Sequence, residues 1–208
     1  MQQAVIENRK AFARGLQNQS LTVAPLCLNP LMARIAQDTG FTCGYLSGGA
    51  LGFELAVSEA LLTLTEVSSY ARQITSRSDI SLIVDAGVGF GDAVHAWRTC
   101  RDIEATGAVA LEIEDQVSPK RVHHHKGVEH LVSTSEMEEK IRETVAARDD
   151  PNFTVIARTS AIANESIDKA ISRANAYAGA GADVILLSPR SEEEIKLLGA
   201  SISMPMAI

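Results

Sequence analysis

Short apolar runs alternate with longer amphipathic segments along almost the whole chain. The apolar runs have the length and residue types of buried strands, and they cover residues 21–24, 43–46, 81–84, 109–113, 154–157, 184–187 and 205–208. The amphipathic segments predict helices near residues 31–39, 62–77, 92–106, 136–148, 165–180 and 191–199. Strands that alternate with helices are typical of a parallel sheet with helices packed outside it.

Polar residues follow nearly every predicted strand, and they favour a barrel over an open sheet. In a (β/α)8 barrel the carboxyl ends of all strands meet on one face, whereas in an open sheet they spread along an edge. Such a barrel typically needs about 250 residues, and this chain has 208. We therefore predict a single α/β domain over residues 1–208, a (β/α)8 TIM-type barrel truncated within its seventh strand, with the C-terminal part missing.

Composition narrows the classes of partner. The net charge is −7 and no extended basic cluster is present, which argues against nucleic acid as a partner. The chain has neither a long apolar run nor a recognisable signal peptide, so we expect no membrane contact and a cytoplasmic location. Its three cysteines are scattered and are expected to be reduced thiols. An anionic substrate would therefore need local positive charge or a metal ion.

The first candidate for chemistry is Asp85, in the stretch "SLIVDAGVGFGDAVHAW". An acid at a strand end, followed by Gly87, Gly89 and Gly91, suits a metal site because glycines let backbone and ligand approach closely. Alternatively, Asp85 is a structural cap of the turn that follows it, and this interpretation stays as open as the metal site. The glycine spacing does not match a dinucleotide-binding fingerprint.

Two further acids stand in "LEIEDQVSPKR". Glu112 and Glu114 alternate along a strand, so both side chains face the same side of the sheet. If that side is the barrel interior, an uncompensated pair is costly and favours a cation or a shared proton. The alternative is that Glu112 pairs with a basic side chain in the core. Arg158, which ends a later strand, either binds a substrate carboxylate or forms an ion pair with Glu114 or Asp115.

The stretch "KRVHHHKG", residues 120–127, combines two lysines with three consecutive histidines. Adjacent residues in a loop rarely bind one metal ion together. We therefore expect either a solvated loop or a mobile lid that contacts an anionic substrate.

Together these stretches resemble the isocitrate lyase / phosphoenolpyruvate mutase superfamily. The matching segments are "NPLMARIAQDTGF", "GYLSGG", "LLTLTEV", "IVDAGVGFGDA", "IEDQVSPKR", "EKIRETVAAR", "VIARTSA" and "RANAYAGAGADVI". The resemblance implies a (β/α)8 barrel in a homo-oligomer, usually a tetramer. It also implies bound Mg2+, or Mn2+ in its place, and the breaking or making of C–C or P–C bonds beside a 2-oxo acid.

The resemblance also implies roles for particular residues. Those that would bind the substrate are Tyr45, Ser47, Gly48, Gly49 and Arg158. Asp85 would contact the metal directly and Glu114 would hold its water molecules. Residues 120–127 would form a gating loop, and the residues that would carry catalysis are His124, Lys120 and Glu114.

Four departures from the family pattern bear on these roles. Gly87 stands where the family has a second acid, Glu59 where it has an aspartate, and Ser160 where it has another aspartate. The gating loop lacks the cysteine that lyase members use as an acid or base. Since Val122 cannot transfer a proton, the task would pass to His124.

The leading functional hypothesis is a Mg2+-dependent lyase or decarboxylase. Its substrate would be a small 2-oxo or 2-hydroxy di- or tricarboxylic acid, cleaved at a C–C bond through an enolpyruvate-like intermediate. Two alternatives stay open: a mutase or hydrolase acting on the P–C bond of phosphonopyruvate, and a relative that binds carboxylates without catalysis.

Overall fold

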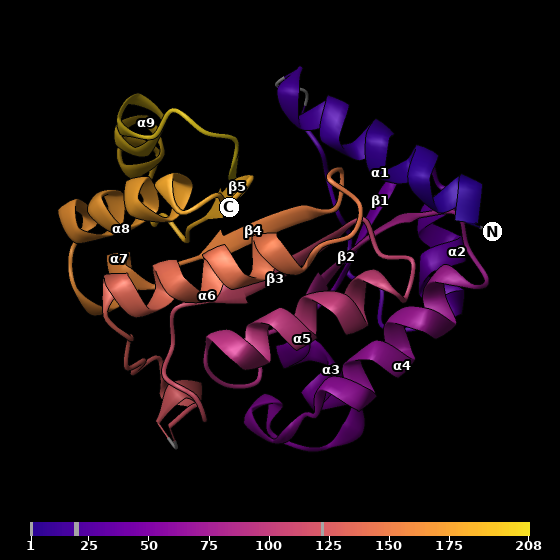
Figure 1. Cartoon of the computed structure of the whole chain (residues 1–208), viewed down its shortest axis with the longest axis horizontal. Helices are drawn as coiled ribbons and strands as arrows, with labels where there is room; N and C mark the ends of the chain where they lie inside the picture. Colours follow the sequence, from indigo (N-terminus) through magenta and orange to yellow (C-terminus); the bar gives the residue numbers. More distant parts are fainter. Residues whose placement is uncertain (1, 19–20, 122) are drawn as a thin grey trace.

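The computed structural model describes residues 2–18, 21–121 and 123–208. Six parallel strands pair in chain order in one sheet, which curls as Figure 1 shows. They are β1 (Cys43–Leu46), β2 (Ser81–Asp85), β3 (Ala110–Glu114), β4 (Thr154–Arg158), β5 (Val184–Leu186) and β6 (Met206–Ala207). Sequential parallel strands with helical crossovers are the arrangement of a (β/α)8 barrel. The fold is thus an α/β half-barrel, consistent with a truncated TIM-type barrel.

All six predicted helices are present, and they cover the outer face of the sheet. They are α2 (Pro30–Asp38), α4 (Leu64–Thr75), α5 (Ala93–Glu104), α6 (Thr134–Ala147), α8 (Ile167–Gly179) and α9 (Glu192–Ser201). In Figure 1, α4, α5, α6 and α8 lie side by side along this face. The sequence analysis missed five further elements: α1 (Gln2–Gln17), α3 (Gly48–Leu55), α7 (Ala161–Asn164) and the short 3-10 helices η1 (Glu59–Leu61) and η2 (His124–Lys126).

The predicted strand at residues 21–24 is wrong. Leu21 is 92% exposed, and the segment forms no ladder with its neighbours. Instead the backbone after this segment bonds to the sheet at Tyr45, whose N–H donates to the carbonyl oxygen of Pro25 and whose carbonyl oxygen accepts the N–H of Cys27, each at 2.9 Å. Pro25 has no N–H to donate, which limits pairing at this edge. With β6 as the last strand, the sheet has six strands, and the predicted seventh strand is not confirmed.

The two faces of the sheet have different characters because successive side chains point to opposite sides. The outer face packs against the helices in the main hydrophobic core, which includes Leu82, Leu111 and Phe153. The inner face begins with a small apolar layer, where strand residues meet Phe12 and Leu16 of α1. Towards the carboxyl ends of the strands the inner positions become polar; they are Tyr45, Asp85, Glu112, Glu114 and Arg158.

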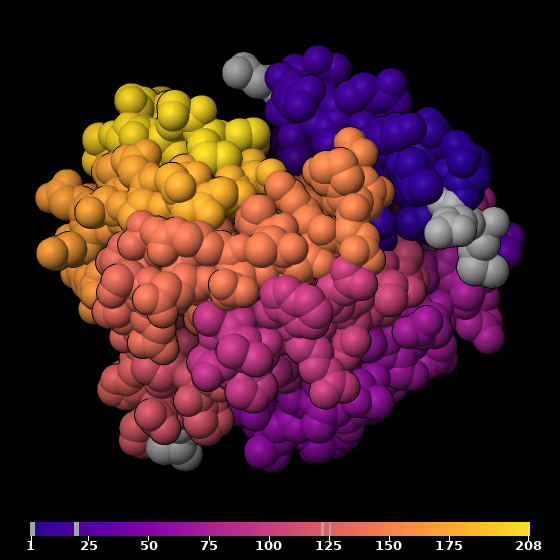
Figure 2. Space-filling view, in the orientation of Figure 1, coloured from indigo at the N-terminus to yellow at the C-terminus, as the bar shows by residue number. Residues whose placement is uncertain are grey.

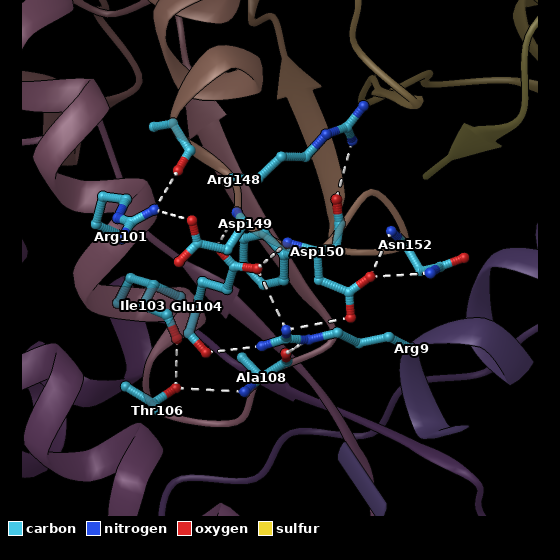
Figure 3. A network of polar contacts seen from close by, with 12 residues as sticks. Arg9, Arg101, Ile103, Glu104, Thr106, Ala108, Arg148, Asp149, Asp150 and Asn152 are labelled. Carbon is cyan, nitrogen blue, oxygen red and sulfur yellow. Dashed lines mark hydrogen bonds and ion pairs between the residues drawn. The ribbon is translucent and has the colours of Figure 1, made fainter. Parts of the chain in front are cut away.

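Helix α1 closes the amino end of the half-barrel through one buried arginine. Arg9 is 6% exposed, and its guanidinium donates to the carbonyl oxygens of Ala108 at 3.0 Å and Glu104 at 2.7 Å. It also forms ion pairs with the carboxylates of Glu104 and Asp150 at 3.3 and 3.4 Å, as Figure 3 shows. Figure 2 shows the indigo N-terminal helix against the orange segment around residue 150.

Candidate active site

Asp85 ends β2 and points into the space at the carboxyl ends of the strands, which is called the mouth of the half-barrel from here on. It is 7% exposed, and each carboxylate oxygen accepts one backbone N–H, from Gly48 at 2.9 Å and from Gly87 at 2.8 Å. Gly87 adopts a left-handed φ of 52°, which glycine adopts readily. Burial raises the pKa of Asp85, and the nearby Glu114 raises it further. Among the described residues Asp85 has no ion-pair partner, so the carboxylate is oriented but not neutralised.

The glycine-rich turn that carries Gly87 is held by hydrogen bonds from two helices. The buried Lys140 of α6 donates from its Nζ to the carbonyl of Val88 at 2.5 Å. Thr99 of α5 donates its hydroxyl to the carbonyl of Gly89 at 3.0 Å. Asp92 caps α5 by accepting backbone N–H groups of that helix. These contacts fix the backbone that presents an N–H to Asp85.

Glu112 and Glu114 of β3 both face the interior, as their alternation predicts, and both are buried. Glu112 accepts hydrogen bonds from the Tyr45 hydroxyl at 2.7 Å and from Nη1 of Arg158 at 3.2 Å. Burial and the charge of Asp85 raise the pKa of Glu112 to about 7. Of the two interpretations left open for Glu112, pairing with a basic side chain is the one observed, through Arg158.

Arg158 at the end of β4 therefore sits between two carboxylates. Besides Glu112, its Nε lies 3.6 Å from Oε2 of Glu114. Gln116 donates from its side-chain amide to the same oxygen at 3.2 Å. The alternative of an ion pair between Arg158 and Glu114 is thus observed, while Asp115 pairs with Arg173 instead. Arg158 stays about one-third exposed, so its guanidinium remains reachable from the mouth.

Lys120 joins the loop after β3 to the site. Its Nζ lies 2.6 Å from a carboxylate oxygen of Glu114 and 2.6 Å from one of Glu59, which comes from η1. Burial by itself lowers the pKa of Lys120, but Glu114 and Glu59 more than offset this and raise it. The loop is thus held over the mouth by a charged lysine between two carboxylates.

His124 lies in η2 of the same loop, and its ring is directed towards Glu59. The Nε2 atom lies 3.4 Å from Oε1 of Glu59, and Nδ1 lies 2.9 Å from the carbonyl oxygen of Arg121. Val122, where the family cysteine is replaced, lies outside the described residues, so the structure says nothing of that position.

The donor set of the mouth fits a hydrated divalent cation. Four carboxylates meet there, those of Asp85, Glu112, Glu114 and Glu59, against the two cations Lys120 and Arg158. Uncompensated buried negative charge is costly, and hard oxygen ligands suit Mg2+. No group of three or more His, Cys, Asp or Glu side chains forms a metal cage within the described ranges. The arrangement therefore suits Mg2+, which binds through one or two carboxylates and retains several waters.

The structure brings most of the predicted site residues to one place. Tyr45, Arg158, Lys120, His124 and three glutamates form one connected set of contacts; the glutamates are Glu59, Glu112 and Glu114. Asp85, which accepts from Gly48, stands beside this set as the register partner of Glu112 on the neighbouring strand. Ser47 caps α3 through its hydroxyl. A Cβ at Gly49 would lie 3.2 Å from Oε2 of Glu59, so Gly49 also borders the mouth.

Glu59 and Glu112 were not among the predicted site residues. The alternation with Glu114 placed Glu112 on the correct face, but only its contacts with Tyr45 and Arg158 make it part of the site. Glu59 follows α3 in a segment without strand or helix periodicity. The one signal that could have assigned it to the site was its position, where the family has an aspartate.

We expect the three cysteines to be unreactive in the native protein. Burial raises the pKa of Cys43 to about 12 and that of Cys100 to about 12, and it also raises the pKa of Cys27. Thiolate is the reactive form, so a raised pKa lowers reactivity at neutral pH. Titration with Ellman's reagent should give almost no reaction before denaturant is added and three thiols afterwards. A thiol that reacts rapidly in the folded protein would contradict this packing.

In the part of the chain that is described, no helix has the length and apolar character needed to cross a membrane.

Comparison with known proteins places these observations in context. The profile of the phosphoenolpyruvate phosphomutase family matches residues 12–208. The chain is 43% identical over 178 residues to probable 2-methylisocitrate lyase 1 of Corynebacterium glutamicum, covering 85% of this chain and 58% of that protein. It is 38% identical over 190 residues to 2,3-dimethylmalate lyase of Eubacterium barkeri, covering 90% and 64%. The chain thus spans about three fifths of the length of these relatives.

A solved structure agrees with the half-barrel. The crystal structure of phosphonopyruvate hydrolase in complex with oxalate and Mg2+ superimposes with a TM-score of 0.87 at 35% sequence identity. The match covers 96% of this chain and 70% of that one.

Proposed function

Since this chain belongs to the phosphoenolpyruvate phosphomutase family of the PEP mutase / isocitrate lyase superfamily, we propose that it is a Mg2+-dependent C–C lyase or decarboxylase. Its substrate is a small 2-oxo or 2-hydroxy di- or tricarboxylic acid. The observation that carries the proposal is the meeting of Asp85, Glu114 and Arg158 at the carboxyl ends of three adjacent strands, with an excess of negative charge.

We assign Asp85 and Glu114 to the metal, Asp85 by direct contact and Glu114 through water. Mg2+, or Mn2+ in its place, supplies Lewis-acid stabilisation of negative charge that develops on the substrate oxygen. We assign Arg158 and Tyr45 to a substrate carboxylate: the guanidinium of Arg158 is about one-third exposed, and the Tyr45 hydroxyl would exchange its hydrogen bond to Glu112 for one to the substrate. We also assign Ser47, Gly48 and Gly49 at the start of α3 to the substrate, since Gly48 borders Asp85 and Gly49 borders Glu59.

Cleavage of a 2-hydroxy acid requires two proton transfers. The hydroxyl loses its proton, the electrons of the broken C–C bond move to the departing carbon, and that carbon then takes a proton from an acid. We assign proton transfer to His124 and Lys120 of the loop and to Glu114 of β3; Lys120 contacts both Glu114 and Glu59, and His124 contacts Glu59. The same loop excludes water while the bond is open. A homo-oligomeric state and a cytoplasmic location stay predictions from the resemblance.

Replacing His124 with alanine should lower kcat far more than it raises KM. A general acid acts mainly in the transition state, and its removal typically costs about 10²- to 10⁴-fold in rate. Steady-state kinetics with the substrate found in the panel below measures both constants. The matched control is Lys126→Ala in the same loop, which removes an exposed side chain. If His124→Ala raised KM and kept kcat, His124 would be a substrate contact.

Replacing Gly87 with aspartate should tighten Mg2+ binding. A Cβ at this position meets nothing within 4 Å, and aspartate tolerates a left-handed φ better than most residues. A second carboxylate beside Asp85 adds a hard oxygen ligand. Calorimetric titration with Mg2+ measures the change, with Gly87→Asn as the uncharged control. Equal affinity of Gly87→Asp and the unmodified protein would mean that the new side chain points away from the metal.

A turnover panel tests the function. Oxaloacetate, 2-methylisocitrate, 2,3-dimethylmalate and phosphonopyruvate are each incubated with the protein and Mg2+, and oxalate binding is measured alongside. Turnover of one of the first three acids supports the proposal. The 35% identity to phosphonopyruvate hydrolase makes P–C hydrolysis the second candidate, and turnover of phosphonopyruvate alone would favour it. Oxalate binding without turnover would indicate a non-catalytic relative.

A further inference from the structure

The loop between β3 and α6 is closed at its base by backbone pairing. Gln116 and Leu131 form an antiparallel bridge, which is called the loop base from here on. One hydrogen bond of this bridge runs from the N–H of Val132 to the carbonyl oxygen of Asp115 at 2.8 Å. The two loop residues that we assign to proton transfer lie beyond this point of the chain. The orientation of the loop base therefore affects where their side chains reach.

A buried cluster from α8 contacts both sides of the loop base. Nη1 of Arg173 donates to the carbonyl oxygen of Val132 at 3.0 Å and lies 3.3 Å from Oδ2 of Asp115. The hydroxyl of Tyr177 donates to the same carboxylate oxygen at 2.7 Å and accepts a hydrogen bond from Arg173 at 3.0 Å. Asp115 and Tyr177 are fully buried, and Arg173 is 7% exposed. One buried guanidinium thus joins the outgoing side of the loop to its returning side.

The orientation of this guanidinium is set by Glu165, which follows α7. Nε and Nη2 of Arg173 donate to the two carboxylate oxygens of Glu165 at 3.0 and 2.8 Å. Because such a bidentate pair fixes the plane of the guanidinium, Nη1 is directed to the loop base. A lysine at the same position keeps the positive charge but has no planar fork, so it cannot bind Glu165 and the loop base with this geometry.

The returning side of the loop has a second contact from the same region of the fold. Asn164, the last residue of α7, accepts the backbone N–H of Glu129 through its side-chain oxygen at 3.1 Å. Its side-chain amide donates to the carbonyl oxygen of Ser160 at 3.0 Å. The segment after β4, which supplies α7 and α8, therefore holds the return of the loop at two places.

We propose that Arg173 is a positioning residue for the reaction proposed above. It binds the loop base and thereby sets where Lys120 and His124 stand over the mouth. None of the partners of Arg173 named above is assigned to the metal or the substrate, so Arg173 acts through the loop and not by contact. This inference rests on the proposed function, because it takes the two loop residues as groups that transfer protons.

Steady-state kinetics of Arg173→Lys, with Mg2+ and the acid that the turnover panel identifies, is the first test. We expect kcat to fall at least about tenfold, because displacing a reacting group by about 1 Å typically costs about 10²-fold in rate. KM should change by less than about threefold, because Arg173 contacts no residue assigned to the substrate. The matched control is Arg142→Lys on α6, where the exposed lysine can still pair with Glu138 and kcat should stay near normal.

A double-variant cycle distinguishes positioning from a general loss of structure. Residues that act through one another have non-additive effects. The fall in kcat caused by Arg173→Lys should therefore be at least about threefold smaller in protein that already carries His124→Ala. A general loss of structure lowers kcat by the same factor in both backgrounds, and this additive result overturns the positioning role.

Cleavage by trypsin measures the loop without turnover. Arg121 and Lys126 are exposed in the loop, and both arginine-to-lysine substitutions keep the number of trypsin sites. We expect cleavage after these two residues to be at least about tenfold faster in Arg173→Lys than in the control, because lost hydrogen bonds of a charged group favour local opening by at least about that factor. Tyr177→Phe removes one buried hydroxyl and should accelerate the same cleavage about two- to twelvefold.

The outcomes separate this inference from the proposed function. Unchanged kcat in folded Arg173→Lys, or loop cleavage as slow as in the control, overturns the positioning role even in an active enzyme. If Arg173→Lys does not fold, unchanged kcat and cleavage in Tyr177→Phe overturn it instead. Absence of turnover of any acid in the unmodified protein, together with absence of Mg2+-dependent oxalate binding, rejects the proposed function, and with it the role of Arg173 in catalysis, whatever the rate of loop cleavage.

Discussion

Replacing Asp85 with alanine is expected to abolish Mg2+-dependent turnover and to leave the fold intact. Among the described residues, the carboxylate of Asp85 has no ion-pair partner. Two backbone N–H groups, of Gly48 and Gly87, orient it. A metal that stabilises developing charge supplies several kcal/mol, so kcat/KM should fall by about 10³-fold or more. The fold should survive because the substitution removes a buried carboxylate whose pKa is already raised by burial.

Two measurements distinguish loss of the site from loss of the fold. Mg2+ should raise the melting temperature of the unmodified protein but not of Asp85→Ala, while the far-ultraviolet circular dichroism of both stays the same. The control is Asp92→Ser in the same turn, where serine can still cap α5. Near-normal turnover of Asp85→Ala would mean that the metal site lies elsewhere.

Replacing Arg9 with methionine is expected to lower the free energy of unfolding by about 3–5 kcal/mol, the usual cost of breaking a buried ion pair. The guanidinium bonds to Glu104, Asp150 and the carbonyl of Ala108 and lies 5.0 Å from the centre of the Phe153 ring. Its removal leaves the buried Glu104 carboxylate without its cation. In Figure 3, Arg9 is the labelled residue of α1 that joins this network.

Urea unfolding followed by circular dichroism measures this loss. Arg14→Met is the matched control, because Arg14 lies on the same helix, is exposed and makes one hydrogen bond to the carbonyl of Lys10. The control should change the free energy of unfolding by no more than about 0.5 kcal/mol. A loss below about 1 kcal/mol in Arg9→Met would mean that α1 contributes little to holding the half-barrel together.

The pattern of apolar and polar residues was sufficient to find an element wherever it repeated with the period of a strand or of a helix. The strands from β1 to β5 and six helices lie where the apolar runs and amphipathic segments place them. The failures have identifiable causes. Residues 21–24 look like a strand by composition, but the adjoining Pro25 has no N–H and the segment never joins the ladder. Helix α1 was missed because its charged and polar residues obscure a narrow apolar side formed by residues such as Phe12 and Leu16.

For the candidate site, the sequence by itself determined which chemical groups reach the carboxyl ends of the strands. The period of two placed Glu112 and Glu114 on one face, and strand ends followed by loops placed Asp85 and Arg158 at the same edge. Only the tertiary structure decided which charges meet. Glu59 and Lys120 are far apart in sequence and form an ion pair because the sheet curls and the loop folds back over the mouth. The cavity beside Asp85 arises in the same way, because residues of η1, α4 and the turn after β2 line it and no local periodicity connects them.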